Sequence, residues 1–282
     1  HERIRYPEKT RFWPQRVGIS MTNSTIHPTA LIAPEAEIGE GVEIGAYAVI
    51  ESGVQVGDGC RILGHAQILS GVRLGENCVV GHGAVIGGEP QDFKFSREIR
   101  SGVEIGAGTI LREHVTVHRG SREGSMMRLG VDNFLMAGSH VGHNVQMGDN
   151  NVLANQCLLG GEVQIGTRNF LGGGSAFHQF VRVGDLCMVK GLTAISQDVP
   201  PFVMVSGSNQ IRGLNVVGMS RAGFCKEQRQ GVKAAFHHIY RAGLNLSQAL
   251  EAAKELEWLE EGHQFIDFFR NASAKGVCRL DR

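Results

Sequence analysis

Every sixth residue along most of this chain is apolar. The series starts at Ile26 and runs unbroken to Ile86; after a shift of one residue it resumes at Ile105 and ends at Ile195. Only Glu123 interrupts the second series. A sustained period of six matches neither an amphipathic helix nor a simple alternating strand. It is the signature of a parallel β-helix, in which each hexapeptide forms one side of a prism and three hexapeptides make one coil.

The repeat predicts a mainly β protein with two parts. We expect a parallel β-helix over residues 21–198 and a C-terminal helical domain over residues 199–282. Hexapeptide β-helices as a class wind left-handed, against the usual right-handed crossover rule, so a left-handed β-helix is expected from the class and not from the spacing. Residues 1–20 are irregular and basic and precede Met21, and we interpret them as a leader or tag outside the fold.

The C-terminal domain shows helical periodicity in three places, over residues 224–242, 246–259 and 262–271. The first helix is predicted to be amphipathic, with its apolar residues on one face. The basic residues of the opposite face are Lys226, Lys233, His237 and Arg241.

Composition narrows the possible partners. The 39 glycines and 6% aromatic residues indicate a repetitive backbone instead of a standard globular core. Lysine plus arginine equals aspartate plus glutamate at 28 each, which gives no general argument for a nucleic acid or an anionic membrane as partner. No apolar run approaches the roughly 20 residues that a transmembrane helix needs. We therefore expect a cytoplasmic protein.

The position two before each inward residue is restricted to small side chains. Four of the six cysteines occupy it, and no Cys-x-x-Cys pair exists, so packing is favoured over a zinc or redox site. Asn133, Asn151 and Asn169 occupy the same slot one coil apart. Because buried polar groups need partners, we expect a hydrogen-bonded ladder of side-chain amides.

Two polar stretches, residues 88–102 and 119–128, are predicted to project from the prism as loops. Loops that project from a rigid scaffold commonly carry binding residues.

The 18-residue coil also places the histidines. His140 and His143 flank the inward Val141, and the residues that follow one and two coils later on the same edge are Glu162, His178 and Gln179. With adjacent coils about 4.8 Å apart, these side chains gather within roughly 10 Å of axial rise. His118 is expected on a different side of the prism, so that it could join them only across a subunit interface.

Seven motifs in order carry a family resemblance: GGEPQDFKF, TVHRGS, SHVGHN, LANQCLLGGEV, FHQFVRVG, SQDVPPF and GLNVVGMSRAGF. With them the chain resembles the bacterial acyl-carrier-protein–UDP-N-acetylglucosamine O-acyltransferases from about Ile26 to the C-terminal helices. The resemblance implies a homotrimer of left-handed β-helices with active sites in the clefts between subunits. It also implies transfer of a 3-hydroxyacyl chain from acyl carrier protein to the glucosamine 3-hydroxyl of UDP-N-acetylglucosamine, the first step of lipid A biosynthesis. No metal and no other cofactor is implied, because the acyl group arrives on the phosphopantetheine of the carrier protein.

The resemblance also assigns roles to residues. His143 matches the catalytic general base, and Gly161, one coil above it, matches the glycine whose N–H stabilises the oxyanion. His118 matches a histidine supplied by the neighbouring subunit, and Gly191, beside Lys190, matches the position that limits acyl length. The positions that match acceptor, nucleotide or pantetheine contacts are Asp92, Lys94, His140, His178, Gln179, Asn215 and Arg221. Because the carrier protein is acidic, the basic residues Lys226, Lys233 and Arg241 are predicted to form its docking face.

The chain departs from the family pattern near the predicted base. Asn144 stands where the family usually has aspartate, and Glu162, one coil above it, stands where histidine is frequent. One expectation is that Glu162 supplies the charge that the aspartate supplies in relatives and so raises the pKa of His143. The other is that Glu162 indicates a different acceptor, such as a 3-amino sugar. In the tail, Val217 and Ala222 replace a usual glutamate and arginine.

Three other functions remain open from the sequence. One is the related hexapeptide N-acyltransferase that acts on the glucosamine amine. A second is a γ-type carbonic anhydrase with zinc on His118, His140 and His143. The third is a binding scaffold without catalysis.

Overall fold

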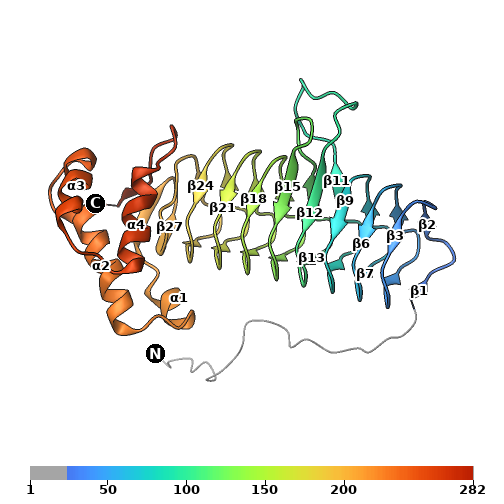
Figure 1. The fold of residues 1–282 in the computed structure, drawn as a ribbon, viewed down its shortest axis with the longest axis horizontal. Helices are drawn as coiled ribbons and strands as arrows, with labels where there is room; N and C mark the ends of the chain where they lie inside the picture. The colour runs from blue at the N-terminus through green and yellow to red at the C-terminus, as the bar shows by residue number, and fades with distance from the viewer. Residues whose placement is uncertain (1–23, 282) are drawn as a thin grey trace.

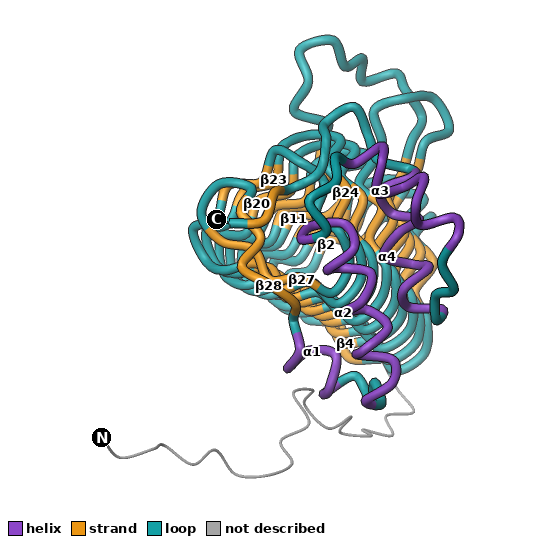
Figure 2. Tube along the Cα trace, turned by 90° about the vertical axis from the view of Figure 1, so that its left-hand side faces the viewer, coloured by secondary structure: helices purple, strands orange, loops and turns teal. Residues whose placement is uncertain are grey.

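Residues 24–281 form a long prism of short parallel strands with a helical region at its C-terminal end (Figure 1). This computed structural model shows three sheets, here called A, B and C, which the chain visits in turn, so that each coil contributes one strand to each sheet. Figure 2 looks along the long axis and shows the coils stacked behind one another. The predicted β-helix and the helical region after it are confirmed.

Sheet A contains β1 (Thr25–Ile26), β4 (Glu43–Ile44), β7 (Arg61–Ile62), β10 (Val79–Val80), β13 (Ile110–Leu111), β16 (Phe134–Leu135), β19 (Val152–Leu153), β22 (Phe170–Leu171), β25 (Met188–Val189), β27 (Val203–Ser206), β28 (Gln210–Leu214) and β29 (Arg279–Leu280). Sheet B contains β2 (Leu31–Ile32), β5 (Val49–Ile50), β8 (Gln67–Ile68), β11 (Val85–Gly88), β14 (Thr116–His118), β17 (His140–Val141), β20 (Leu158–Leu159), β23 (Ala176–Phe177) and β26 (Ala194–Ile195). Sheet C contains β3 (Glu37–Ile38), β6 (Gln55–Val56), β9 (Val72–Leu74), β12 (Gly102–Ile105), β15 (Met126–Leu129), β18 (Gln146–Met147), β21 (Gln164–Ile165) and β24 (Arg182–Val183).

The core is a column of inward side chains stacked one coil apart. Val141 of β17 is in register with Leu159 of β20, which is in register with Phe177 of β23, and all three are buried. The polar backbone between them is satisfied from coil to coil, as where the Gly142 N–H donates to the Leu159 carbonyl at 2.9 Å. Each coil is therefore built on the coil below it.

The predicted amide ladder is confirmed. The Asn151 side-chain carbonyl accepts from the Asn169 backbone N–H at 2.9 Å and from the Asn169 side-chain NH₂ at 3.0 Å. Asn133 accepts in the same way from the Asn151 backbone N–H, and Asn169 from that of Cys187. Buried amides are stable here because each has a partner in the neighbouring coil.

The hexapeptide around Glu123 is not part of the prism. Val117 in β14 is followed on the next side by Leu129 in β15, and residues 119–125 project between them. Val117 is in register with Val141, so the step between these coils is 24 residues and not 18. The expectation that His118 lies on a different side of the prism is therefore wrong, because it counted a looped-out hexapeptide as one side.

The C-terminal region begins with strands, since β27 and β28 extend sheet A before the first helix. Its helices are α1 (Val216–Arg221), α2 (Lys226–Arg241), α3 (Leu246–Ala252), the short 3₁₀ turn η1 (Ala253–Glu255) and α4 (Glu260–Arg270). The helix predicted over 246–259 ends early, because Leu256 and Leu259 adopt extended backbone angles. The short helix α1 was not predicted, although Asn215 caps its N-terminus.

The chain end returns to the prism. Buried Asp198 accepts hydrogen bonds from the backbone N–H and the hydroxyl of Ser273, and β29 pairs with β28. Phe236 of α2 packs against Phe265 of α4, with ring centroids 6.1 Å apart. The tail is thereby held against the last coils, close to the edge where the candidate site lies.

Candidate active site

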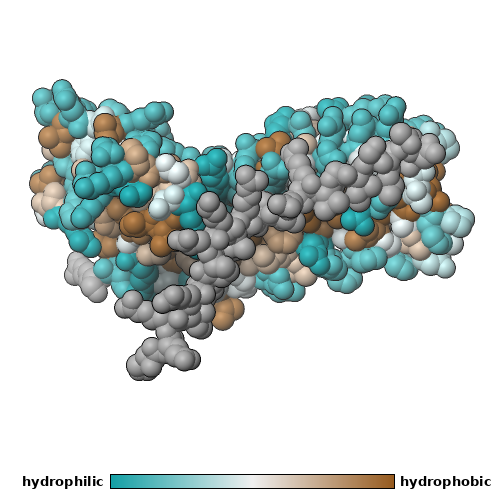
Figure 3. Space-filling model, turned by 90° about the horizontal axis from the view of Figure 1, so that it is seen from below, coloured by the Kyte–Doolittle hydropathy of each residue, from teal (hydrophilic) through white to brown (hydrophobic). Residues whose placement is uncertain are grey.

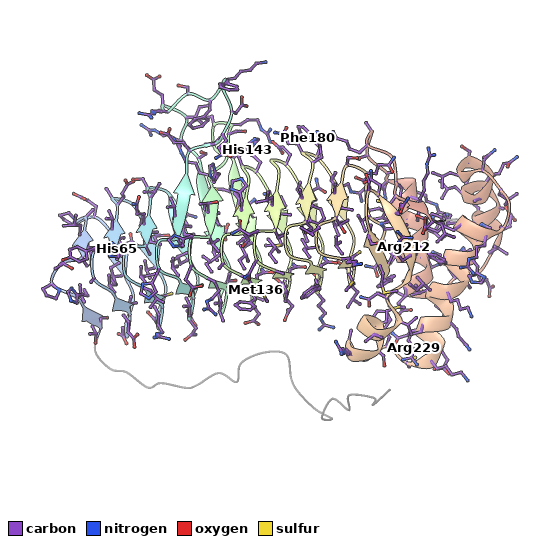
Figure 4. All side chains as sticks on the ribbon, turned by 180° about the vertical axis from the view of Figure 1, so that it is seen from behind. His65, Met136, His143, Phe180, Arg212 and Arg229 are labelled. Atoms are coloured by element: carbon purple, nitrogen blue, oxygen red, sulfur yellow. The ribbon has the colours of Figure 1, made fainter. Side chains whose placement is uncertain are left out.

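The candidate site lies on the edge where the chain passes from sheet B to sheet C. Both projecting loops leave the prism here, residues 88–102 between β11 and β12 and residues 119–125 between β14 and β15. His143 follows β17 on the same edge, one coil further along. In Figure 4, His143 and Phe180 lie on the edge that carries the projecting loops, whereas Met136 lies on the opposite side of the prism.

The ring of His143 is oriented by its neighbour Asn144. The Nδ1 atom of His143 lies 3.0 Å from the side-chain oxygen of Asn144. An amide oxygen can only accept, so Nδ1 carries the proton and Nε2 is left as the acceptor. Asn144 has a φ of 59°, a left-handed conformation that asparagine tolerates better than most residues. The ring nitrogen needed for proton abstraction is therefore Nε2.

Gly161 lies directly against that nitrogen. A Cβ atom at position 161 would come closer than 3.0 Å to three atoms of the imidazole, with Nε2 the nearest. Within residues 24–281, the Gly161 N–H has no backbone carbonyl as its acceptor. The expected stacking of Gly161 on His143 is present.

His118 lies in the same subunit as His140 and contacts it directly. Their rings meet edge to face with centroids 4.9 Å apart, and His140 Nδ1 lies 2.8 Å from the Thr116 hydroxyl. Burial, reinforced by His118, lowers the pKa of His140 to about 4. Burial is also the main reason that the pKa of His118 is lowered. Both rings are therefore neutral at pH 7.

Glu162 has a partner that the sequence interpretation missed. Its carboxylate forms an ion pair with Arg122 of the projecting loop, at 2.5 Å. The negative charge expected to act on His143 is thus balanced by a guanidinium. Arg122 could not be found from the hexapeptide count, because it lies in the stretch that leaves the prism.

Further along the edge, His178 and Gln179 are exposed, two coils beyond His143. Lys275 from the C-terminal tail also reaches this point. Its Nζ lies 3.2 Å from His178 Nδ1 and 5.8 Å from the centroid of the Phe180 ring. The tail therefore adds a cation to the edge that sequence spacing did not reveal.

Further predicted site residues lie in the first projecting loop and around α1. Asp92 and Lys94 are exposed in the first projecting loop, where the Asp92 carboxylate accepts from the Lys94 N–H at 2.9 Å. Asn215 uses its side chain within the chain, accepting from Gly218 and donating to the Leu186 carbonyl at 2.8 Å. Arg221 is exposed in the last turn of α1.

The residues predicted to limit acyl length lie on the edge between sheets A and B. Lys190 and Gly191 are exposed there, and a Cβ at 191 would lie 3.0 Å from the carbonyl oxygen of Gly173. Together with Gly172 and Gly173, Gly191 leaves a strip of bare backbone. Such a strip can accommodate an extended apolar chain.

Lys226, Lys233 and Arg241 are all exposed on α2, opposite the face that packs on α4. Among residues 24–281, no three His, Cys, Asp or Glu side chains are grouped so that they could hold a metal ion. No helix in the same span is both long and apolar enough to cross a membrane.

The fold and the family comparisons together place the chain among the hexapeptide-repeat transferases. A family model described as bacterial transferase hexapeptide (six repeats) matches residues 53–88, and one described as UDP N-acetylglucosamine O-acyltransferase, domain 2, matches residues 198–278. The chain is 40% identical over 263 residues to the acyl-carrier-protein–UDP-N-acetylglucosamine O-acyltransferase of Paraburkholderia phymatum, an alignment that spans 91% of this chain and all of the relative. The corresponding protein of Xylella fastidiosa is 39% identical over 86% of this chain and 95% of its own.

Comparison with solved structures leads to the same family as the sequence comparison. LpxA from Acinetobacter baumannii superposes with a TM-score of 0.85 at 34% identity, covering 90% of this chain and 99% of that one. The UDP-N-acetylglucosamine acyltransferase of Francisella novicida gives a TM-score of 0.86 at 30% identity, over 91% of this chain and 94% of that one. The chain belongs to the acyl-carrier-protein–UDP-N-acetylglucosamine O-acyltransferase family. Membership makes it an acyltransferase and sets aside the carbonic anhydrase and the silent scaffold.

The contact between Gly161 and the imidazole predicts a large effect of a single methyl group. In Gly161→Ala, the new Cβ must displace the ring of His143, and misplacing a catalytic group by about 1 Å costs roughly 100-fold in rate. We expect kcat to fall by about that factor with little change in the thermal midpoint. Gly262→Ala in α4 is the control, because its backbone is helical and its new Cβ would lie no closer than 3.4 Å to any neighbouring atom. Equal activity of the two variants would contradict the close packing of glycine on the base.

The lowered pKa of His140 predicts a pH-dependent stability. Between its ordinary value of 6.5 and about 4 the folded protein keeps this ring neutral, while the unfolded chain binds a proton. Stability from this group is therefore present above pH 6.5 and is lost as the pH falls toward 4. We expect His140→Gln to lose less thermal stability than the wild type between pH 7.5 and 4.5. Parallel losses in the two proteins would show that His140 does not titrate in this way.

Proposed function

We propose that His143 is the general base of an acyl transfer from acyl carrier protein to UDP-N-acetylglucosamine, the reaction for which the relatives are named and which begins lipid A biosynthesis. The observation that carries the proposal is the orientation of the His143 ring, whose Nδ1 lies 3.0 Å from the Asn144 side-chain oxygen and whose Nε2 lies on the side of Gly161. A base and an oxyanion donor within one small space are the two groups that acyl transfer needs.

The reaction balances with these two groups alone. His143 Nε2 takes the proton from the glucosamine 3-hydroxyl as that oxygen attacks the thioester carbonyl carbon. The carbonyl oxygen becomes negatively charged, and the Gly161 N–H donates to it. When the carbon–sulfur bond breaks, the imidazolium returns its proton to the phosphopantetheine thiolate. The cycle needs no metal ion and no cofactor besides the acyl carrier.

The neutral histidines His118 and His140 suit the binding of an acceptor sugar beside the base. A neutral imidazole can donate or accept a hydrogen bond without the cost of burying a charge. Within this proposal, His178 and Gln179 continue the acceptor site along the edge, Asp92 and Lys94 close it from the loop, and Asn215 and Arg221 serve the nucleotide or pantetheine from α1. The bare strip beside Gly191 receives the acyl chain, and Lys190 flanks its end.

A homotrimer is part of the proposal, and the outer faces of the prism support it. From β10 to β25 the outward residues of sheet A form an apolar row that comprises Val79, Ile110, Phe134, Val152, Phe170 and Met188, whereas the outward residues of β4 and β7 are Glu43 and Arg61. The outward row of sheet C is polar and comprises Gln55, Arg73, Glu104, Arg128, Gln146, Gln164 and Arg182. Figure 3 shows hydrophobic side chains gathered along the prism in the view from below. A contiguous apolar face of this kind needs a partner, and further copies of the chain can cover it.

Removing the base tests the proposal directly. We expect His143→Ala to lower kcat/KM by about 1,000-fold, within the range typical of general-base catalysis, while light scattering still reports three chain masses. His65→Asn is the control, since His65 lies on another edge with a φ of 61° that asparagine accepts. The assay follows transfer from a 3-hydroxyacyl carrier protein to UDP-N-acetylglucosamine. Activity of His143→Ala within tenfold of the wild type would contradict the assignment of His143 as the general base.

The carrier protein is proposed to dock on the exposed basic residues Lys226, Lys233 and Arg241 of α2. Attraction between a basic helix face and an acidic protein speeds association and is screened by salt. Because acyl carrier protein is the donor, we also propose that the enzyme acts in the cytoplasm.

Charge reversal on α2 tests the dock. In Lys226→Glu/Lys233→Glu, we expect the KM for the acyl carrier protein to rise about tenfold and its dependence on salt to flatten, with the KM for the nucleotide sugar unchanged. Lys254→Glu is the control, because Lys254 lies in η1 and is paired with Glu251 at 2.6 Å. If the double variant keeps the wild-type KM for the acyl carrier protein, the carrier protein does not dock on this face of α2.

A further inference from the structure

The second projecting loop is tied to the catalytic edge by four residues, here called the loop latch: Ser121, Arg122, Asn144 and Glu162. Asn144 and Glu162 lie on the edge of the prism, one coil apart. Ser121 and Arg122 belong to the hexapeptide that leaves the prism. The contacts among these four residues connect segments that are 23 and 40 positions apart in sequence.

Asn144 is the first half of the latch. Its side-chain oxygen accepts from the backbone N–H and the hydroxyl of Ser121, both at 2.8 Å, and is also the atom that orients His143. Asn144 is buried, with 5% of its surface exposed. One uncharged oxygen therefore fixes the loop and the catalytic ring at the same time.

Glu162 is the second half. Its two carboxylate oxygens lie 2.5 and 3.4 Å from the two terminal nitrogens of Arg122, an end-on pairing. The Glu162 side chain is 18% exposed and that of Arg122 is 65% exposed, so the guanidinium covers the carboxylate from the solvent side. A carboxylate that is mostly covered needs such a partner. Glu162 is also adjacent to Gly161, so the pair joins the loop to the coil that carries the oxyanion donor.

The two projecting loops act as one body. Ser101 donates to the Gly120 carbonyl at 2.5 Å, and the Glu123 carboxylate accepts from the Arg100 N–H at 2.9 Å. Arg119 donates to the Ile99 carbonyl at 2.5 Å and lies over the Phe95 ring at 4.8 Å. Whatever holds residues 119–125 therefore also holds the loop that carries Asp92 and Lys94.

We propose that Arg122 and Glu162 are positioning residues. They hold the two projecting loops, residues 88–102 and 119–125, over His143 and so set the affinity for the nucleotide-sugar acceptor. The proposal rests on the proposed function, because the acceptor is bound between the loops and the base. Asn144 and Glu162 then form a matched set with Ser121 and Arg122: an amide oxygen suits two serine donors, and a carboxylate suits the guanidinium. The charge of Glu162 serves the loop and not the imidazole.

The test compares Arg122→Gln, Glu162→Gln and the charge swap Arg122→Glu/Glu162→Arg with the wild type. We expect each single variant to raise the KM for UDP-N-acetylglucosamine about fivefold with kcat within twofold and the KM for the acyl carrier protein unchanged. The swap should bring the KM back to within twofold of the wild type. Hydrogen exchange of the 88–102 and 119–128 amides should quicken in the single variants and return to normal in the swap.

Arg128→Gln is the matched control. It removes an ion pair of similar length, 3.1 Å to Glu104, from the outer face of sheet C, and should leave the acceptor KM unchanged. If the wild type does not acylate the nucleotide sugar, the proposed function fails. If the wild type is active but the single variants keep its KM, or lose kcat instead, the positioning role alone is overturned. If the charge-swap variant keeps a raised KM for UDP-N-acetylglucosamine, the ion pair between positions 122 and 162 does not set the acceptor affinity.

Discussion

Everything in this protein depends on the stacking of one coil on the next. Inward side chains such as Val141, Leu159 and Phe177 pack in a column, and the backbone between them is hydrogen-bonded from coil to coil. Since each coil repeats the path of the last, a residue is fixed relative to those one coil away, however exposed it is. The prism therefore orders its surface as strictly as its core.

That order allows catalytic groups to be assembled without a buried pocket in one chain. The proposed base His143 and the proposed oxyanion donor Gly161 occupy the same edge in successive coils, and Gly161 can lie against the ring because it has no side chain. Tilting of the ring is prevented by Asn144, which is itself held in a left-handed corner. Holding reacting groups in a fixed geometry lowers the activation barrier, because less orientational freedom is lost when the reaction occurs.

The segments outside the repeat bring long polar side chains to the edge that carries His143. Only the stretches that leave the prism can bring long polar side chains over an edge, and the 119–125 loop uses Arg122 for this purpose. The C-terminal tail does the same with Lys275, which reaches His178 from the far end of the chain. His118 and His140 are buried against each other, and the resulting lowered pKa values add neutral donors and acceptors to the edge that carries His143.

The sequence alone determined the coil, the order of the inward residues and the stacking of Gly161 on His143, because all three follow from the six-residue period. It also determined the asparagine ladder, because buried polar groups must have hydrogen-bond partners. It also predicted a loop over residues 119–128, but the count of prism sides still included the hexapeptide around Glu123. Counting Glu123 as one side misplaced His118, hid Arg122 and left Glu162 without its partner. These contacts join segments that the period does not relate, so only the folded path of the loops and the tail decided them.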